Sequence, residues 1–169
     1  AHEASGRGGE FVAVNCGAVP DDLIEAELFG HVGGAYTGAR REGGIGLIAS
    51  ADGGTLLLDE VRELRPALQA VLLRFLDDGL VRPVVGTVAR RVDVQLLAAS
   101  NVDLKAEVAA RRFREDLFFR LITVTVTLPP LRARRDFAAA VQATLASLDA
   151  QATVTPRAIE RLAQHGWPG

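Results

Sequence analysis

Short apolar runs alternate along the chain with segments in which apolar residues recur at helical spacing. Buried strands of a parallel sheet are typically continuous apolar runs of about four to eight residues. The pattern predicts four such strands, at residues 11–15, 55–58, 94–99 and 122–128, the last rich in β-branched residues. Helical spacing, acidic first turns or an early proline predict helices. These lie at residues 21–28, 66–76, 103–110, 115–119, 136–148 and 156–164, with Thr155 as the N-cap of the last.

Strands that alternate with helices favour an α/β fold with a mostly parallel sheet between helical layers. Residues 81–92 predict a hairpin or an irregular insertion within that alternation. Pro129 and Pro130 interrupt it, and an alanine-rich helical pattern follows them. We therefore expect an α/β domain over residues 1–130 and the start of a small helical subdomain over residues 131–169.

Composition narrows the class of protein. The chain has 169 residues, of which 49% are hydrophobic, and this is enough for one packed core. Its 19 basic and 21 acidic residues give a net charge of −2, which gives no global indication of nucleic-acid binding. A single cysteine, Cys16, excludes an internal disulfide framework, and no apolar run has the roughly 18 residues of a membrane span. We expect a soluble cytoplasmic protein, and the start without Met predicts a fragment of a longer chain.

Two adjacent carboxylates end the second expected strand. Residues 54–60 read Gly-Thr-Leu-Leu-Leu-Asp-Glu, so Asp59 and Glu60 follow a buried apolar run. Carboxylates at such a position are typical of a Walker B motif, in which the Asp holds Mg²⁺ on nucleotide phosphates and the Glu polarises the attacking water. The alternative is a strand that ends in two acidic residues because it reaches solvent there.

A glycine-rich loop follows the first expected helix and contains the only tyrosine of the chain. Its central residues are Gly34, Ala35, Tyr36, Thr37, Gly38 and Ala39. Glycines allow such a loop to fold back tightly, and an exposed aromatic side chain at its tip is typical of an anchor for a partner. The alternative is a flexible loop with a packed tyrosine.

These six residues resemble the GAFTGA loop of the bacterial enhancer-binding proteins, the AAA+ activators of sigma-54 RNA polymerase. Other stretches that resemble motifs of that family occur in the family's order, at residues 27–31, 51–60, 113–117, 128–132 and 166–169. The resemblance covers nearly the whole chain. Residues 38–43 and 81–86 are similar to activators of the acetoin-catabolism type. The resemblance implies a three-layer AAA+ domain of the P-loop-NTPase type with the start of a helical lid.

The resemblance also implies roles in an ATP site. Asp59 and Glu60 would be the Walker B pair, with Asp59 as the Mg²⁺ residue. Asn15 would hydrogen-bond Glu60 and couple the nucleotide state to loop movement; alternatively, it closes a turn at the strand end. Ser100 and Asn101 resemble sensor I, which reads the γ-phosphate, with Ser100 in place of the more usual Thr. Their alternative role is to cap the helix expected at residue 103.

Two arginines match the arginine fingers of the family. Arg114 and Arg120 would each place a guanidinium beside the γ-phosphate bound by a neighbouring subunit, where it neutralises developing charge. From the residues alone, a solvated helical face rich in arginine is the better explanation.

The implied partners are sigma-54 and RNA polymerase. Thr37 matches the threonine that contacts sigma-54, and Tyr36 replaces the usual Phe of the loop. The resemblance further implies self-association into a ring, with a hexamer as the expected form, and DNA binding only through a C-terminal domain outside this chain.

One motif of the family is missing from the sequence. No segment reads Gly-x-x-x-x-Gly-Lys-Ser/Thr, the loop whose backbone N–H groups and lysine hold the phosphates. In the family this loop lies just upstream of the stretch that matches the first residues here, and the sensor II arginine lies just beyond residue 169. Three functions therefore stay open: a sigma-54 activator ATPase, a sigma-54-binding fragment without turnover, and an AAA+ domain with another client.

We predict that the 169-residue chain alone binds Mg-ATP weakly or not at all and has little or no ATPase activity. The reason is that no other segment of the sequence replaces the phosphate-binding loop. Titration calorimetry with Mg-ATP and a phosphate-release assay test this prediction. Clear binding or measurable turnover by the purified chain would contradict it.

Overall fold

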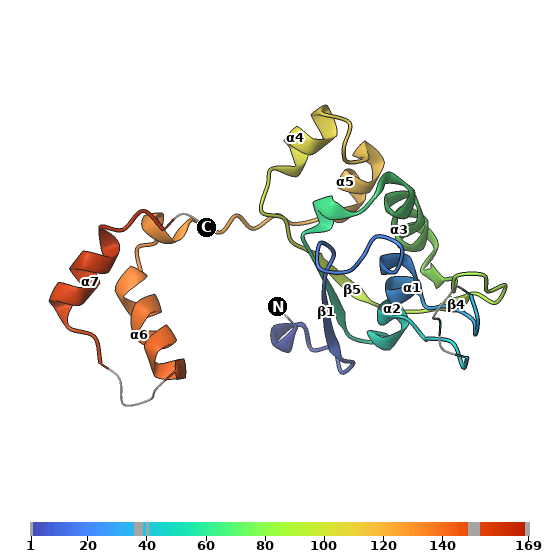
Figure 1. Cartoon of the computed structure of the whole chain (residues 1–169), viewed down its shortest axis with the longest axis horizontal. Helices are drawn as coiled ribbons and strands as arrows, with labels where there is room; N and C mark the ends of the chain where they lie inside the picture. Colours follow the sequence, from blue (N-terminus) through green and yellow to red (C-terminus); the bar gives the residue numbers. More distant parts are fainter. Residues whose placement is uncertain (1, 36–38, 40, 149–152, 168–169) are drawn as a thin grey trace. The chain divides into compact units, whose positions relative to one another are not determined.

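The computed structural model describes residues 2–35, 39, 41–148 and 153–167. Contacts divide the chain into two compact units, residues 1–123 and 124–169, which are described separately (Figure 1). No helix within the described ranges is both long and apolar enough to cross a lipid bilayer. The elements, in chain order, are η1 (Glu3–Ser5), β1 (Phe11–Asn15), α1 (Ile24–Phe29), α2 (Leu47–Ser50), β2 (Thr55–Asp59), η2 (Val61–Glu63), α3 (Pro66–Asp78), β3 (Leu80–Val81), β4 (Arg90–Arg91), β5 (Gln95–Ala98), α4 (Leu104–Ala109), α5 (Glu115–Leu121), η3 (Leu131–Ala133), α6 (Phe137–Leu148) and α7 (Pro156–Ala163).

Three parallel strands form the centre of the first unit, in the order β1–β2–β5. The register pairs Asn15 of β1 with Asp59 of β2, and Leu58 of β2 with Ala98 of β5. Parallel strands need crossover connections, and α1 and α2 lie in the first crossover whereas α3 lies in the second. Figure 1 shows α1 and α3 beside these strands. The carboxyl ends of all three strands therefore meet at one edge of the sheet.

One face of the sheet belongs to the hydrophobic core. Val14, Leu56 and Leu58 share this face and are buried, since register partners in a parallel sheet point to the same side. Each large apolar side chain buried here contributes about 1.5–3 kcal/mol relative to exposure. The same core cluster contains the buried residues of α1 and α3: Ile24, Leu28, Phe29, Leu68, Leu72 and Phe75.

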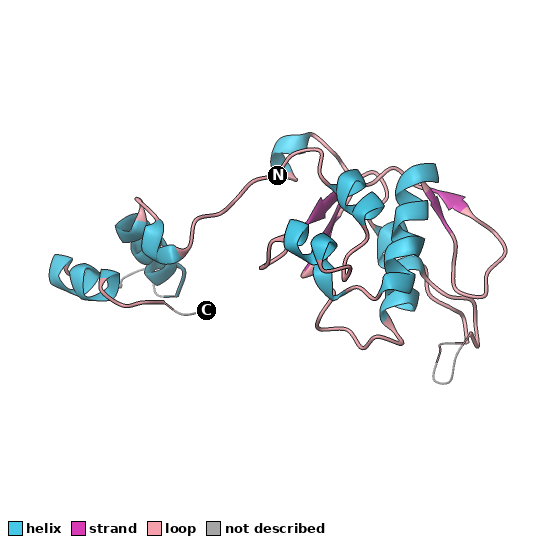
Figure 2. Cartoon of the chain, turned by 90° about the horizontal axis from the view of Figure 1, so that it is seen from above, coloured by secondary structure: helices cyan, strands magenta, loops and turns pink. Residues whose placement is uncertain are grey.

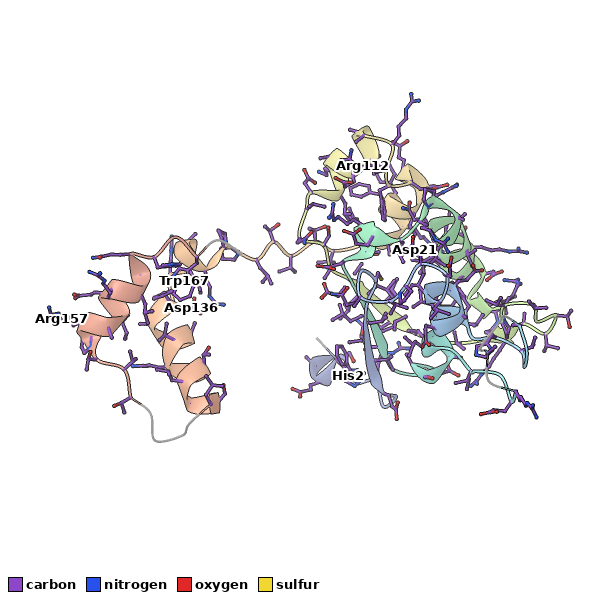
Figure 3. All side chains as sticks on the ribbon, viewed as in Figure 1. His2, Asp21, Arg112, Asp136, Arg157 and Trp167 are labelled. Atoms are coloured by element: carbon purple, nitrogen blue, oxygen red, sulfur yellow. The ribbon has the colours of Figure 1, made fainter. Side chains whose placement is uncertain are left out.

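The opposite face of the sheet is covered less well. Phe11 is 48% exposed, and Leu57 and Leu97 are half-buried. His2, which is labelled in Figure 3, lies just before η1. Its ring lies 5.7 Å from the ring of Phe11, and its Nδ1 lies 2.9 Å from Oγ1 of Thr55. The first residues of the chain therefore cover only the amino end of this face.

Most elements expected from the sequence are confirmed. Three expected strands, at residues 11–15, 55–58 and 94–99, agree with β1, β2 and β5 to within one residue at each end. The expected hairpin or insertion at residues 81–92 contains the antiparallel pair β3–β4. The helix expected at residues 66–76 continues to Asp78, where Gly79 ends it with φ of 66°. The short helix α2 was not expected, because glycines surround it.

Helix boundaries differ where a turn precedes the helix. The helix expected from residue 21 begins at Ile24, because the carbonyl of Pro20 accepts hydrogen bonds from the N–H groups of Leu23 and Ile24 and so forms a turn. The helix expected at residues 103–110 is α4, with the Asp103 side chain accepting from the N–H of Lys105 at 2.9 Å as its N-cap. Helix α5 continues beyond the expected end at residue 119 to Leu121.

The strand expected at residues 122–128 is wrong. This segment forms no strand, and Val124, Val126 and Leu128 are 80%, 76% and 83% exposed. β-branched residues favour extended backbone, but a strand also needs a neighbouring chain that supplies N–H and C=O groups. Nothing among the described residues pairs with this segment.

The second unit contains helices and no strand among its described residues (Figure 2). Thr155 caps α7 as expected, since its side chain accepts a hydrogen bond from the N–H of Ala158 at 3.3 Å. The indole Nε1 of Trp167 donates to the carbonyl of Leu162 at 2.8 Å, and the Trp167 ring lies 6.2 Å from that of Phe137. This aromatic pair joins α6 to the residues after α7. The identity of this unit as a lid subdomain stays a prediction.

A close backbone contact at the start of β2 provides a test of the fold. A Cβ at Gly54 would overlap the carbonyl oxygen of Glu10. We predict that Gly54→Ala lowers the free energy of unfolding by about 1–3 kcal/mol, because the two backbones must separate. Gly8→Ala is the matched control, since no atom lies within 4 Å of its added Cβ. Urea denaturation followed by circular dichroism measures the free energy of unfolding of both variants. Equal values for Gly54→Ala and the parent chain would contradict the close contact.

Candidate functional site

The carboxyl edge of the sheet brings together residues from three separate parts of the sequence. Asn15 ends β1 and is the register partner of Asp59, which ends β2. The N–H of Cys16 donates to the carbonyl of Asp59 at 2.9 Å and extends this pairing by one residue. Ser100 follows shortly after the end of β5. Ligands of open α/β sheets typically bind at this edge.

Glu60 has an unusual backbone conformation for a residue with a side chain. Its φ of 51° and ψ of 45° lie in the left-handed region, which costs on the order of 1–3 kcal/mol. The conformation is held on both sides: the N–H of Glu60 donates to Oδ1 of Asp59 at 2.9 Å, and the N–H of buried Val61 donates to the carbonyl of Ala99 at 3.0 Å. The chain therefore turns sharply from β2 into η2, and Glu60 stands at the turn.

Asn15 closes a turn after β1. Its Oδ1 accepts hydrogen bonds from the N–H groups of Gly17 at 2.8 Å and Ala18 at 3.1 Å. A Cβ on Gly17 would lie 2.7 Å from Oε2 of Glu60 and 3.4 Å from Oδ1 of Asn15, so this turn passes close to both side chains. The turn-closing role expected as an alternative is therefore present. A switching contact of Asn15 with Glu60 stays a prediction.

The end of β2 carries two adjacent carboxylates, Asp59 and Glu60. No ion pair within the described part of the chain involves Asp59 or Glu60, and both side chains are half-buried. Burial, followed by the negative charges of Asp59 and Glu60, raises the pKa of the Cys16 thiol to about 11. Uncompensated carboxylate oxygens are suitable ligands for a hard divalent cation.

Ser100 and Asn101 lie at the same edge but do not cap α4. Ser100 Oγ donates to the carbonyl of Val102 at 2.9 Å and accepts from its N–H at 3.2 Å. Asp103 is the N-cap, so the alternative role of this pair as the helix cap is wrong. Asn101 is exposed. The pair remains available for the predicted sensor role.

Arg114 and Arg120 lie on a different element from the strand-end residues. Arg114 precedes α5 and makes a two-pronged contact with Asp116, at 3.0 Å and 2.7 Å. Arg120 in the last turn donates to the carbonyl of Leu76 at 2.8 Å and lies 3.5 Å from Asp77. Both guanidinium groups are exposed, where ion pairs contribute about 0–1 kcal/mol. These exposed positions are compatible with a solvated, arginine-rich helix face. They are equally compatible with arginine fingers that reach the nucleotide of a neighbouring subunit.

The base of the glycine-rich loop is closed by backbone hydrogen bonds. The N–H of His31 donates to the carbonyl of Gly44 at 2.9 Å, and the N–H of Gly44 returns the bond at 2.9 Å. Gly34 has φ of 73°, and the N–H of Ala35 donates to the carbonyl of Val32 at 3.2 Å. Tyr36, Thr37 and Gly38, the centre of the expected sigma-54 contact, lie outside the described residues.

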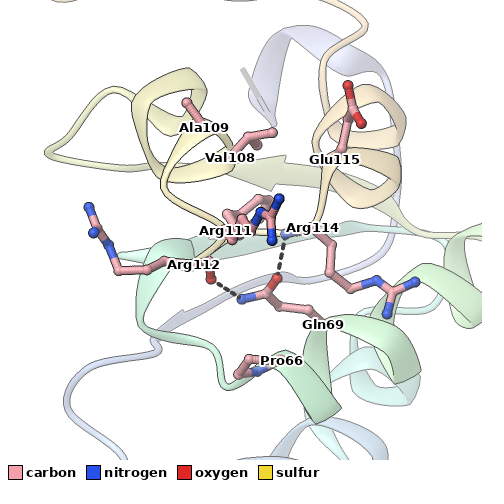
Figure 4. Close-up of a pocket in the computed structure, with 9 residues that line it drawn as sticks. Pro66, Gln69, Val108, Ala109, Arg111, Arg112, Arg114 and Glu115 are labelled. Atoms are coloured by element: carbon pink, nitrogen blue, oxygen red, sulfur yellow. Dashed lines mark hydrogen bonds between the residues drawn. The ribbon is translucent and has the colours of Figure 1, made fainter.

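Sequence analysis missed a hollow beside Arg114 (Figure 4). It has a volume of about 390 Å³. Gln69 is one of its lining residues and is completely buried, although the other buried positions of its helix α3 are apolar. The sequence contained one indication of this polar site: Gln69 directly follows Leu68, one of the apolar residues of this helix that are spaced for burial. The lining residues are Pro66, Gln69, Val108, Ala109, Arg111, Arg112, Phe113, Arg114 and Glu115.

Comparison with known families identifies the class of the protein. The profile of the Sigma-54 interaction domain matches residues 1–127, and the chain belongs to this family. The expected resemblance to sigma-54-dependent activators is thereby confirmed.

Curated relatives of the chain are longer regulators. The chain is 48% identical to the acetoin catabolism regulatory protein of Cupriavidus necator, over 99% of this chain and 26% of that protein. It is 44% identical to the regulatory protein LuxO of Vibrio cholerae, over 99% of this chain and 38% of that protein. The chain thus spans well under half the length of these relatives.

Solved structures confirm the expected AAA+ α/β fold. The structure of NtrX from Brucella abortus in complex with ATP superposes with a TM-score of 0.82 at 35% identity, over 99% of this chain and 39% of that one. Hsp104 of S. cerevisiae, at 19% identity and a TM-score of 0.65, shares the fold alone.

The charge at the strand ends can be tested through Cys16. We predict that Glu60→Gln lowers the pKa of the thiol below about 11, because it removes one of the two carboxylates that oppose formation of the thiolate. Alkylation by iodoacetamide should then become half-maximal at a lower pH. Glu10→Gln, an exposed change just before β1, should leave the profile unchanged. Identical profiles for Glu60→Gln and the parent chain would place Glu60 away from the thiol.

Proposed function

We propose that the chain is the central part of a cytoplasmic activator domain that couples ATP hydrolysis to remodelling of the closed complex of sigma-54 RNA polymerase. The observation that carries the proposal is the assembly of Asn15, Asp59, Glu60 and Ser100 at one sheet edge. Membership of the Sigma-54 interaction domain family supports it. Residues 1–130 would form the α/β part and residues 131–169 the start of the lid, and the division of contacts after Thr123 supports this assignment.

The strand-end residues fit a nucleotide with its magnesium ion. Asp59 offers carboxylate oxygens that no described cation neutralises, and such oxygens suit Mg²⁺ bound to phosphates. Mg²⁺ would neutralise charge on the transferred phosphoryl group when bound. Glu60 would polarise the attacking water, and its fixed left-handed backbone supports a defined position for that carboxylate. Asn15 would read the state of Glu60, while Ser100 and Asn101 would sense the γ-phosphate. The ATP complex of NtrX supports nucleotide binding.

Arg114 and Arg120 would act at the nucleotide of a neighbouring subunit in a ring, with a hexamer as the proposed form. Their exposure on α5 supports a role outside their own strand-end site. A planar guanidinium pairs well with phosphoryl oxygens, and its contribution to phosphoryl transfer is on the order of 10³–10⁵-fold in rate. Hydrolysis would move the loop of residues 34–39 against sigma-54, with Tyr36 and Thr37 as its contacts.

A sigma-54-binding module without turnover is the second candidate function. The observation that favours it is the absence of a Gly-x-x-x-x-Gly-Lys-Ser/Thr motif from the 169 residues. An AAA+ domain with another client is the third, and the sequence Gly-Ala-Tyr-Thr-Gly-Ala at residues 34–39 opposes it.

The full-length protein that contains this chain tests the proposal. We predict that Glu60→Gln lowers kcat for ATP hydrolysis by roughly 10²–10⁴-fold while Mg-ATP affinity is retained, because the change removes the water-activating carboxylate but no phosphate contact. Immobilised sigma-54 should capture both the parent protein and this variant, and Thr37→Ala should lose capture. A phosphate-release assay, calorimetry and the capture assay provide the measurements.

Glu10→Gln is the control and should match the parent in all three assays. Equal kcat for Glu60→Gln and the parent would contradict the catalytic assignment. Capture of sigma-54 without any hydrolysis by the parent would favour the second candidate. Hydrolysis without capture would favour a different client.

A further inference from the structure

Gln69 is a completely buried polar side chain at the start of α3. Its Nε2 donates to the carbonyl of Leu64 at 2.7 Å and to the carbonyl of Arg112 at 3.2 Å. Its Oε1 accepts from the backbone N–H of Arg114 at 2.9 Å. Figure 4 shows the two bonds that reach the segment before α5. Every polar atom of the amide is therefore satisfied by backbone, which offsets the cost of burying it.

These bonds hold the segment from which Arg114 projects. The contacts to Arg112 and Arg114 lie on either side of Phe113, which is buried against the core. Arg111 precedes them with φ of 57°, in the left-handed region that a residue with a side chain rarely adopts. The N–H groups of Arg112 and Phe113 donate back to the carbonyl of Glu107 in α4, at 3.0 Å and 3.3 Å. The buried amide and the apolar anchor add to these bonds and connect the segment to α3.

The placement of the Arg114 guanidinium depends on this backbone. Its side-chain partner, Asp116, is only two residues away on the same exposed helix start, so that ion pair moves with the segment. The carbonyl of Arg114 accepts from the N–H of Phe118 within α5, and its own N–H donates to Gln69. The bond to Gln69 therefore connects the main chain of Arg114 to α3.

The same amide also reaches the segment that follows the carboxylate pair. Leu64, whose carbonyl accepts from Gln69, follows η2, and η2 begins directly after Glu60. One side chain thus connects the turn after Glu60 with the backbone of Arg114.

We propose that Gln69 is a positioning residue that fixes Arg114 for its action at a neighbouring subunit. This inference rests on the proposed function of Arg114. If Gln69 had a purely structural role, its replacement would lower the stability of the domain. It would then weaken to the same extent both hydrolysis at the subunit's own site and the action of Arg114 at the neighbouring site. Loss of a positioning amide displaces Arg114 and so weakens its action at the neighbouring subunit. Hydrolysis at the subunit's own site stays intact, because the hydrogen bonds that hold the Glu60 backbone, to Asp59 and through Val61 to Ala99, do not involve Gln69.

Mixed rings of the full-length protein separate these roles. A Glu60→Gln subunit cannot hydrolyse ATP but still presents Arg114, whereas an Arg114→Ala subunit keeps Glu60 and lacks the arginine. Mixing the two should restore ATPase activity. Adding Gln69→Met to the Glu60→Gln subunit should lower the restored activity roughly tenfold or more, since a displacement of about 1 Å at such a group costs up to about 100-fold. Adding Gln69→Met to the Arg114→Ala subunit should leave the restored activity intact.

Each outcome bears on a separate claim. Equal loss in both arrangements, or loss only with the Arg114→Ala subunit, would overturn the positioning role. Failure of the first mixture to restore any activity would instead refute the action of Arg114 at a neighbour and so the proposed function. Leu72→Val, a buried apolar change on the same helix, is the matched control, and it should lower the melting temperature without selective loss in either arrangement.

A second readout needs no nucleotide and no activity. In the 169-residue chain, Gln69→Met should speed hydrogen exchange of the Arg114 amide roughly tenfold, because it removes the acceptor of that N–H. Leu72→Val leaves the Gln69 acceptor in place and should keep the exchange of the Arg114 amide slow. Unchanged exchange in Gln69→Met would overturn the proposal even where the mixed rings are too unstable to assay.

Discussion

The parallel pairing of β2 with β1 and β5 is the constraint on which the site depends. The register places Asn15 beside Asp59, and it brings the end of β5 to the same edge. No local sequence contact could do this, because the three segments are far apart along the chain. The buried face of the sheet fixes that register in turn, since a slip of one residue would turn Leu56 and Leu58 out of the core. Packing at the centre of the sheet thus determines the chemistry at its edge.

At Glu60 and at Gln69, hydrogen bonds from neighbouring segments, and not regular secondary structure, hold a strained backbone and a buried polar group. Glu60 keeps a left-handed backbone because hydrogen bonds fix the residues on both sides. Gln69 stays buried because three backbone groups satisfy its amide. Both features concern groups that take part in phosphoryl transfer in the proposed function. The first fixes Glu60, which acts in its own subunit, and the second fixes Arg114, which acts at the neighbouring subunit. They are joined through Leu64, which follows the first and contacts the second.

The sequence predicted three of the four expected strands correctly, and the reasons are physical. Continuous apolar runs predicted β1, β2 and β5 because burial on a sheet leaves a local pattern. The strand at residues 122–128 was wrong because pairing is not local: β-branched residues show what could be extended but not whether a partner strand is present. The buried role of Gln69 was not predicted for a similar reason. Its three hydrogen-bond partners are backbone groups of segments whose positions only the fold determines. The assigned roles of the strand-end residues came from the resemblance and remain proposals.

The uneven covering of the sheet bears on how stability varies with temperature. One face is packed into the core, whereas on the other Phe11 is 48% exposed and Leu57 and Leu97 are half-buried. Apolar area that is already hydrated in the native state adds nothing to the heat-capacity increase on unfolding. For the 169-residue chain taken alone, we therefore expect a flatter curve of stability against temperature than for an equally long domain whose sheet is covered on both faces. We also expect a lower maximum of that curve, because the same area adds no hydrophobic free energy.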